Sequence, residues 1–136
     1  MSERPLADAP PRIGIVLGTR PEVIKLFPLI RALQPFVEAG NVAVEVLSTG
    51  QQRELLDQVL GWLGVVPDCD LQAMNPNDPG ENPALLHARL VTGISHWLRD
   101  RQIDRCVVQG DTSSAHAGAL AAHYLRVPVS HVEAGL

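Results

Sequence analysis

Short apolar runs alternate along the chain with longer segments in which apolar residues recur every three or four positions. Runs of the first kind, rich in β-branched residues and bounded by polar turns, are typical of buried strands, and the second spacing is typical of amphipathic helices. The predicted strands span residues 12–17, 42–49, 70–74, 103–109 and 127–132. The predicted helices cover residues 23–37, 55–63, 86–97 and 113–125. This alternation predicts an α/β fold, a doubly wound parallel sheet of the Rossmann-like type with helices on both faces.

The chain of 136 residues has the size of one domain, large enough to bury a core without disulfides or metal. Aromatic residues make up only 4%, which indicates an aliphatic core. Residues 1–11 are polar and read as a flexible leader, so the folded domain is predicted to cover 12–136. Three prolines in 75–83 predict a surface loop.

Charge and composition exclude several classes of partner. With 11 Lys and Arg against 15 Asp and Glu and no basic run, the chain is not expected to bind nucleic acid. No stretch approaches the roughly twenty apolar residues that cross a bilayer, and the start lacks the apolar part of a signal peptide, so no membrane association is expected. Two cysteines, Cys69 and Cys106, fit reduced thiols in the cytoplasm.

Several common catalytic patterns are absent. Gly14 and Gly18 do not make the dinucleotide spacing G-x-G-x-x-G, and no P-loop is present. His116 and His123 share a helix face but lie two turns apart, about 10 Å of rise, which is too far for one ion. The spacing therefore predicts no metal site, and nothing in it indicates a covalent nucleophile.

Two carboxylates have positions that suit chemistry. Asp111 and Glu133 each follow a predicted strand, and ligands of open α/β sheets bind outside the carboxyl ends of strands. Asp111 also has a structural interpretation, as the cap of the helix that follows. A structural interpretation suits Glu133 less well, because a strand end before Ala134 and Gly135 requires no carboxylate. His131 either orients Glu133 and lines the site or is a hydrogen-bonded core histidine.

The first predicted strand ends in a turn that is followed by two cations. Pro21 suits the first turn of a helix, with the cap at Thr19 or Arg20. Arg20 and Lys25 would then lie beside a helix amino terminus, where anions bind. The alternative is a tight connection with solvated side chains.

Four segments together resemble the amino-terminal half of the UDP-N-acetylglucosamine 2-epimerases. They are Gly18–Lys25 (GTRPEVIK), Thr49–Leu60 (TGQQRELLDQVL), Gln109–Thr112 (QGDT) and His131–Leu136 (HVEAGL). The resemblance implies the amino-terminal domain of a two-domain glycosyltransferase-B-type fold, with the carboxyl-terminal domain absent. It implies an isomerase that interconverts UDP-N-acetylglucosamine and UDP-N-acetylmannosamine by eliminating and re-adding UDP, without a metal or other cofactor.

The resemblance also assigns roles to residues of this chain. The catalytic positions that it implies are Arg20, Lys25, Asp111 and Glu133. The substrate-binding positions are Gly18, Thr19, Gln109, Gly110, Thr112 and His131. The positions for an activating second substrate molecule are Gln51, Gln52 and Arg53. Gln52 departs from the histidine that is common in the family, which puts effector binding in question.

The partners that the resemblance implies are a UDP-sugar substrate, a second copy in a homodimer, and a carboxyl-terminal half made separately. Because the family's remaining catalytic and uridine contacts lie downstream, the chain alone is expected to be inactive. Two alternatives stay open. One is a non-catalytic fragment or binding module that pairs with a separate carboxyl-terminal half, and the other is a hydrolysing relative of the epimerases.

Overall fold

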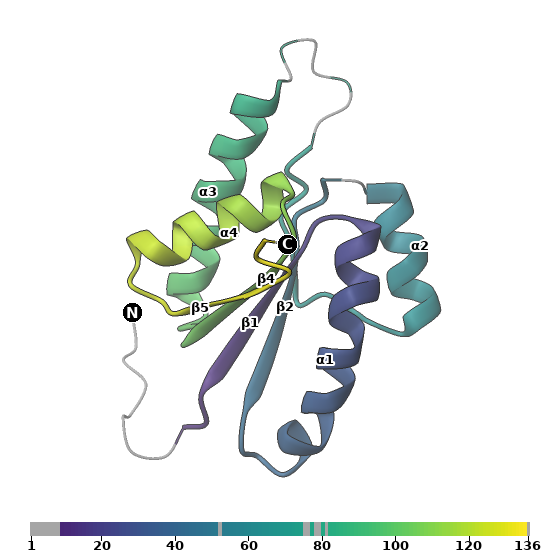
Figure 1. Cartoon of the computed structure of the whole chain (residues 1–136), viewed down its shortest axis with the longest axis vertical. Helices are drawn as coiled ribbons and strands as arrows, with labels where there is room; N and C mark the ends of the chain where they lie inside the picture. The colour runs from purple at the N-terminus through teal and green to yellow at the C-terminus, as the bar shows by residue number, and fades with distance from the viewer. Residues whose placement is uncertain (1–8, 52, 75–76, 78–79, 81, 136) are drawn as a thin grey trace.

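The computed structural model describes residues 9–51, 53–74, 77, 80 and 82–135, with the side chain of Arg53 left out (Figure 1). Gln52, residues 1–8 of the predicted leader and most of the loop at 75–83 lie outside the described residues. The elements in chain order are β1 (Arg12–Leu17), α1 (Arg20–Glu38), β2 (Ala43–Ser48), α2 (Arg53–Leu63), β3 (Cys69–Asp70), α3 (Pro83–Asp100), β4 (Arg105–Gln109), α4 (Ser113–Tyr124) and β5 (Val129–Val132).

The five strands form one parallel sheet in the order β3-β2-β1-β4-β5. In β1, Ile13 lies between Val44 of β2 and Arg105 of β4. The first three strands therefore extend the sheet from β1 to one edge at β3. The next two, β4 and β5, extend it from β1 to the opposite edge. The reversal falls between β1 and β4, and in such sheets the crevice at this point, outside the carboxyl ends of the strands, is where ligands bind. The predicted fold class is confirmed.

The central strands are buried on both faces, which explains their uninterrupted apolar sequences. Along β1, Ile15 and Leu17 pack toward α1 and α2, whereas Val16 packs toward α3 and α4. The two helix pairs lie on opposite sides of the sheet in Figure 1. On α4, a Cβ at Gly118 would lie 2.9 Å from Cγ1 of Val108. The small residues of this helix therefore allow the close approach to the sheet that the sequence predicts.

Two local predictions need correction. The strand predicted at 70–74 is only two residues long, because Gln72 has φ 49° and breaks the extended backbone after Asp70. The cap of α4 is Thr112 and not Asp111, since the Thr112 hydroxyl accepts the amide N–H of Ala115 at 3.1 Å. The cap of α1 is Thr19, with Pro21 in the first turn as expected.

None of the helices in the described part of the chain combines the length and the apolar character that crossing a membrane requires.

The two cysteines are expected to differ sharply in reactivity. Cys106 is fully buried, and this burial raises the pKa of its thiol to about 12. Cys69 is half-buried; burial also raises its pKa, while nearby Arg101 acts in the opposite direction. Because the thiolate is the nucleophile, iodoacetamide at neutral pH should label Cys69 first and Cys106 only after unfolding. Peptide mass spectrometry checks this, and equal labelling of the native protein would contradict the burial of Cys106.

Candidate active site at the switch point

The predicted site residues gather at the carboxyl edge of the sheet, around the switch point. The loop after β1 carries Gly18 and Thr19, and Arg20 begins α1. The loop after β4 carries Gly110, Asp111 and Thr112, and Glu133 directly follows β5. Because these loops leave neighbouring parallel strands at the same edge, segments about 90 residues apart in sequence meet there, as the contact between Thr112 and Glu22 shows.

One cavity of about 700 Å³ brings the two predicted carboxylates together. Asp111 and Glu133 both line it, with His116 from α4 and His131 from β5. Its remaining wall is small and mostly apolar, from the first turns of α4 and from residues 134 and 135. Two carboxylates and two imidazoles that face one apolar space are groups suited to proton transfer.

Glu133 is held by two donors from different elements. Its Oε2 accepts Lys25 Nζ at 2.5 Å and also the side-chain amide of Gln109. The hydrogen bond from Lys25 is the largest cause that lowers the pKa of the Glu133 carboxyl. Desolvation comes next and opposes it, and the charge of Lys25 and the hydrogen bond from Gln109 lower the pKa further. The residue has φ 56°, a left-handed conformation that costs a non-glycine residue energy. The backbone turn after β5 thus aims Glu133 at Lys25.

Asp111 and Arg20 are exposed, and the side chain of neither makes a hydrogen bond within the described part of the chain. For Asp111 this removes the capping interpretation and leaves a carboxylate at the cavity with its oxygens available. His131 donates its Nε2–H to the carbonyl of Gly110 at 2.7 Å. The side-chain partners of Glu133 in the described part of the chain are Lys25 and Gln109, so His131 does not orient it by a hydrogen bond. His131 is exposed, so it is not a core histidine, and it lines the cavity.

Glu22 is a buried carboxylate that the sequence did not single out. It is 0% exposed and accepts the N–H of Gly18, the N–H of Thr19 and the Thr19 hydroxyl, all on Oε2. Its other oxygen, Oε1, accepts the hydroxyl of Thr112 at 2.6 Å. We refer to Gly18, Thr19, Glu22 and Thr112 as the Glu22 bridge. The spacing Thr-x-x-Glu at a helix start is a sequence signal for the local part of this contact, between Thr19 and Glu22, and not for the bond to Thr112.

A second polar contact joins the loop after β2 to the start of α4. The hydroxyl of Ser114 donates to Oε1 of Gln51 at 2.7 Å and lies 2.9 Å from the Thr49 hydroxyl, which therefore donates to it. Of the predicted effector residues, Gln51 thus belongs to this contact. Gln52 lies outside the described residues, and the backbone of Arg53 begins α2.

Two histidines from different helices, α3 and α4, are in contact. The spacing of residues within either helix could not predict this contact. His87 of α3 and His116 of α4 have stacked rings with centroids 4.8 Å apart, and Nε2 of His87 lies 2.8 Å from Nδ1 of His116. One ring therefore donates its proton to the other. Among the residues that the structure describes, no three His, Cys, Asp or Glu side chains form a possible metal site.

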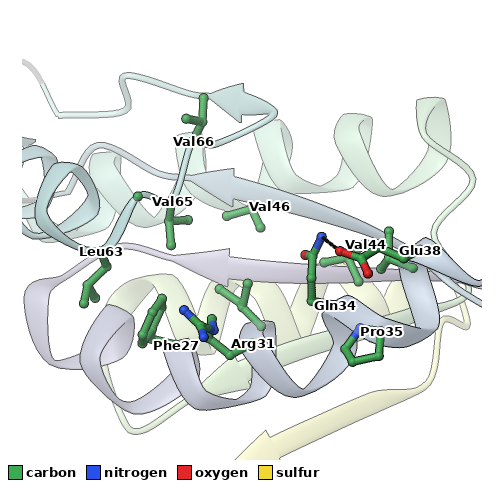
Figure 2. A pocket seen from close by; sticks show the side chains of 13 residues that line it. Phe27, Arg31, Gln34, Pro35, Glu38, Val44, Val46, Leu63, Val65 and Val66 are labelled. Carbon is green, nitrogen blue, oxygen red and sulfur yellow. Dashed lines mark hydrogen bonds between the residues drawn. The ribbon is translucent and has the colours of Figure 1, made fainter.

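A second cavity of about 630 Å³ lies between α1, β2 and the segment after α2 (Figure 2). Its lining is largely aliphatic, with Val44 and Val46 on the strand side and Phe27 and Arg31 on the helix side. It contains none of the predicted site residues. We therefore assign no part of the active site to it.

The ion pair between Lys25 and Glu133 predicts a titration that can be measured. Since the folded pKa of Glu133 lies below the unfolded value, the pair stabilises the fold above the unfolded pKa, and this contribution disappears as the pH falls through the folded pKa. Carbon-detected NMR should place the Glu133 midpoint below the usual glutamate range, and Lys25→Met should move it upward. Arg31→Met, which removes a cation remote from the site, should leave it in place. A midpoint insensitive to Lys25→Met would contradict the pair.

The fold and the cavity define a Rossmann-like α/β domain with a polar site at its switch point. Residues 35–136 match the family model described as UDP-N-acetylglucosamine 2-epimerase, and the chain belongs to this family. The UDP-N-acetylglucosamine 2-epimerase of Escherichia coli K12 is 46% identical over 127 residues, which is 92% of this chain and 32% of that protein. The chain therefore spans about a third of the length of the relatives it matches, their amino-terminal part.

Solved structures agree with this assignment. The epimerase of Neisseria meningitidis bound to UDP-GlcNAc is 38% identical, with a TM-score of 0.80 over 92% of this chain and 32% of that one. The Methanocaldococcus jannaschii enzyme in complex with UDP-GlcNAc and UDP is 35% identical, with a TM-score of 0.79 over 92% and 33%. MurG of Acinetobacter baumannii, 16% identical with a TM-score of 0.69, shares the fold alone.

Proposed function

We propose that this chain supplies one wall of the active site of a UDP-N-acetylglucosamine 2-epimerase. The observation that carries the proposal is the cavity at the switch point, which Asp111 and Glu133 both line while Lys25 holds Glu133. Relatives of the same family have been solved with UDP-GlcNAc bound, and a nucleotide sugar is the substrate that we propose here.

The reaction needs the groups that this cavity supplies. Inversion at C2 of the sugar requires a base to remove a weakly acidic proton and an acid to deliver one to the opposite face. Asp111 and Glu133 are the two carboxylates for these roles. Lys25 orients Glu133, and Arg20 at the start of α1 balances the negative charge that grows on the departing diphosphate.

The proposed division of the protein follows from the length of the relatives. Residues 12–136 form the amino-terminal domain, and a carboxyl-terminal half supplies the opposite wall and the uridine contacts. Positioning on both sides of the reacting carbon contributes a large part of catalysis, so one wall alone should not turn over substrate. We place the protein in the cytoplasm as a homodimer. Its free cysteines fit a reducing compartment.

The test is an assay of UDP-N-acetylglucosamine with the 136-residue chain alone and with the carboxyl-terminal two thirds of the E. coli relative added in trans. We call the second preparation the complemented enzyme. It should form UDP-N-acetylmannosamine, and the chain alone should not. Free N-acetylmannosamine with UDP as the product would instead indicate a hydrolysing relative.

The second candidate function is that of a binding module without catalysis. One feature of the sheet favours it, because β5 is an edge strand and the exposed Val132 lies on it. Light scattering with the added carboxyl-terminal portion discriminates the two. Association without turnover supports the binding module, whereas association with turnover supports the epimerase.

A further inference from the structure

We infer that Glu22 is a positioning residue, whose one buried carboxylate fixes the start of α1, which carries Arg20, against the loop that carries Asp111 across the switch point. The inference rests on the proposed function for its catalytic meaning. The contacts that support it belong to the fold and stand independently.

Glu22 does more than cap its own helix. The local part of the contact uses only Oε2, which accepts three donors from Gly18 and Thr19. Oε1 is left for Thr112, 90 positions further along the chain. A capping carboxylate needs no such partner, and helix caps are usually solvent-exposed, whereas Glu22 is 0% exposed.

Thr112 has no remaining freedom to rotate. Its hydroxyl has one proton, which it donates to Glu22 at 2.6 Å, and the same oxygen accepts the N–H of Ala115 at 3.1 Å. The residue thereby fixes the first turn of α4 to the first turn of α1. Asp111 is the residue directly before Thr112, so its backbone follows this contact.

The two proposed catalytic groups beside the bridge depend on it for their position. The side chains of Arg20 and Asp111 make no hydrogen bonds to other described residues. Their places are therefore set by the backbone segments that carry them, and the Glu22 bridge holds these two segments together. A displacement of about 1 Å between such groups is enough to cost about a hundredfold in rate.

Glutamate suits this bridge better than its closest substitutes. Three residues supply four hydrogen-bond donors to Glu22, so both of its carboxylate oxygens must accept. Glutamine would turn one oxygen into a donor and place it against either the Thr112 hydroxyl or the amides of Gly18 and Thr19. Aspartate lacks one methylene and is too short to span both loops.

Two variants test the bridge from opposite ends. Glu22→Gln should shift the amide NMR signals of residues 111–115 as well as those of residues 18–22. Thr112→Val keeps the three local bonds of Glu22, so it should stay folded and shift the same two groups of signals. Thr112→Ser keeps the hydroxyl and should restore the wild-type spectrum. Changes confined to the mutated loop in both variants would overturn the inference.

A control separates positioning from a general loss of stability. Asn82 caps α3 through the amides of Ala84 and Leu85, so Asn82→Ala removes a cap that has no contact with the bridge. In the complemented enzyme, Thr112→Val should lower kcat by about ten- to a hundredfold with little change in KM, and Asn82→Ala should leave both unchanged. An equal effect of the two variants would overturn the inference. If the wild-type complemented enzyme has no turnover, the proposed function fails. The NMR comparison of Glu22→Gln and Thr112→Val still shows whether the Glu22 bridge couples the two segments.

Discussion

Glu133→Gln is expected to lower kcat of the complemented enzyme by about 10²- to 10⁴-fold, the usual contribution of a positioned acid or base. The substitution keeps the size of the side chain and removes the charge that Lys25 and Gln109 hold in place. Because the role proposed for Glu133 is proton transfer and not substrate binding, KM should change much less. Steady-state rates of UDP-N-acetylmannosamine formation measure both quantities, and Asp111→Asn should have a loss of similar size.

The matched control for this prediction is Glu38→Gln at the other end of α1. Glu38 is an exposed glutamate that accepts a hydrogen bond from Gln34, and it lines the second cavity and not the switch-point cavity (Figure 2). This variant should keep the wild-type rate. If Glu133→Gln and Glu38→Gln behave alike, Glu133 has no role in catalysis and the proposed site is wrong.

Gly18→Ala is expected to lower the free energy of unfolding by about 1–3 kcal/mol, the cost of inserting a methyl group into a well-packed region. An added Cβ would lie 2.6 Å from Cβ of Ser114 and 2.8 Å from the Thr49 hydroxyl. Rotation of the Ser114 hydroxyl cannot relieve the contact with its Cβ, so α4 has to move away from β1. Urea unfolding followed by circular dichroism measures the change.

Two further variants show whether the close approach is the cause. Gly61→Ala adds the same methyl group where no atom lies within 4 Å, in helix α2, and should raise stability by up to about 1 kcal/mol. Placing Ser114→Gly beside Gly18→Ala removes the opposing Cβ and should recover part of the loss. If Gly18→Ala proves as stable as Gly61→Ala, the packing of α4 on this turn is not as described.

The sequence predicts well those strands of the sheet that are buried on both faces. The strands β1 and β4 are buried on both faces, so their apolar runs are uninterrupted and their positions follow directly. The extent of β3 could not be predicted, because it ends at a left-handed residue, Gln72, whose type gives no such signal. The cap of α4 was ambiguous for a related reason, since Asp111 and Thr112 are adjacent and both residue types serve as caps.

For the candidate site, the sequence identifies residues by their place after strands but not their partners. Asp111 and Glu133 follow strands that turn out to be neighbours, β4 and β5, so the parallel sheet brings them to one cavity. The contacts Glu22 to Thr112 and His87 to His116 join different elements. Spacing within one helix carries no information on them, because they depend on how the helices pack.

The role of this chain in an epimerase active site is best tested by product formation from UDP-N-acetylglucosamine, compared among the isolated chain, the complemented enzyme and the complemented Asp111→Asn variant. UDP-N-acetylmannosamine should form at the full rate only in the wild-type complemented enzyme. Turnover by the isolated chain, or equal turnover with and without the Asp111 carboxylate, would contradict the claim that this chain forms one catalytic wall of an epimerase site.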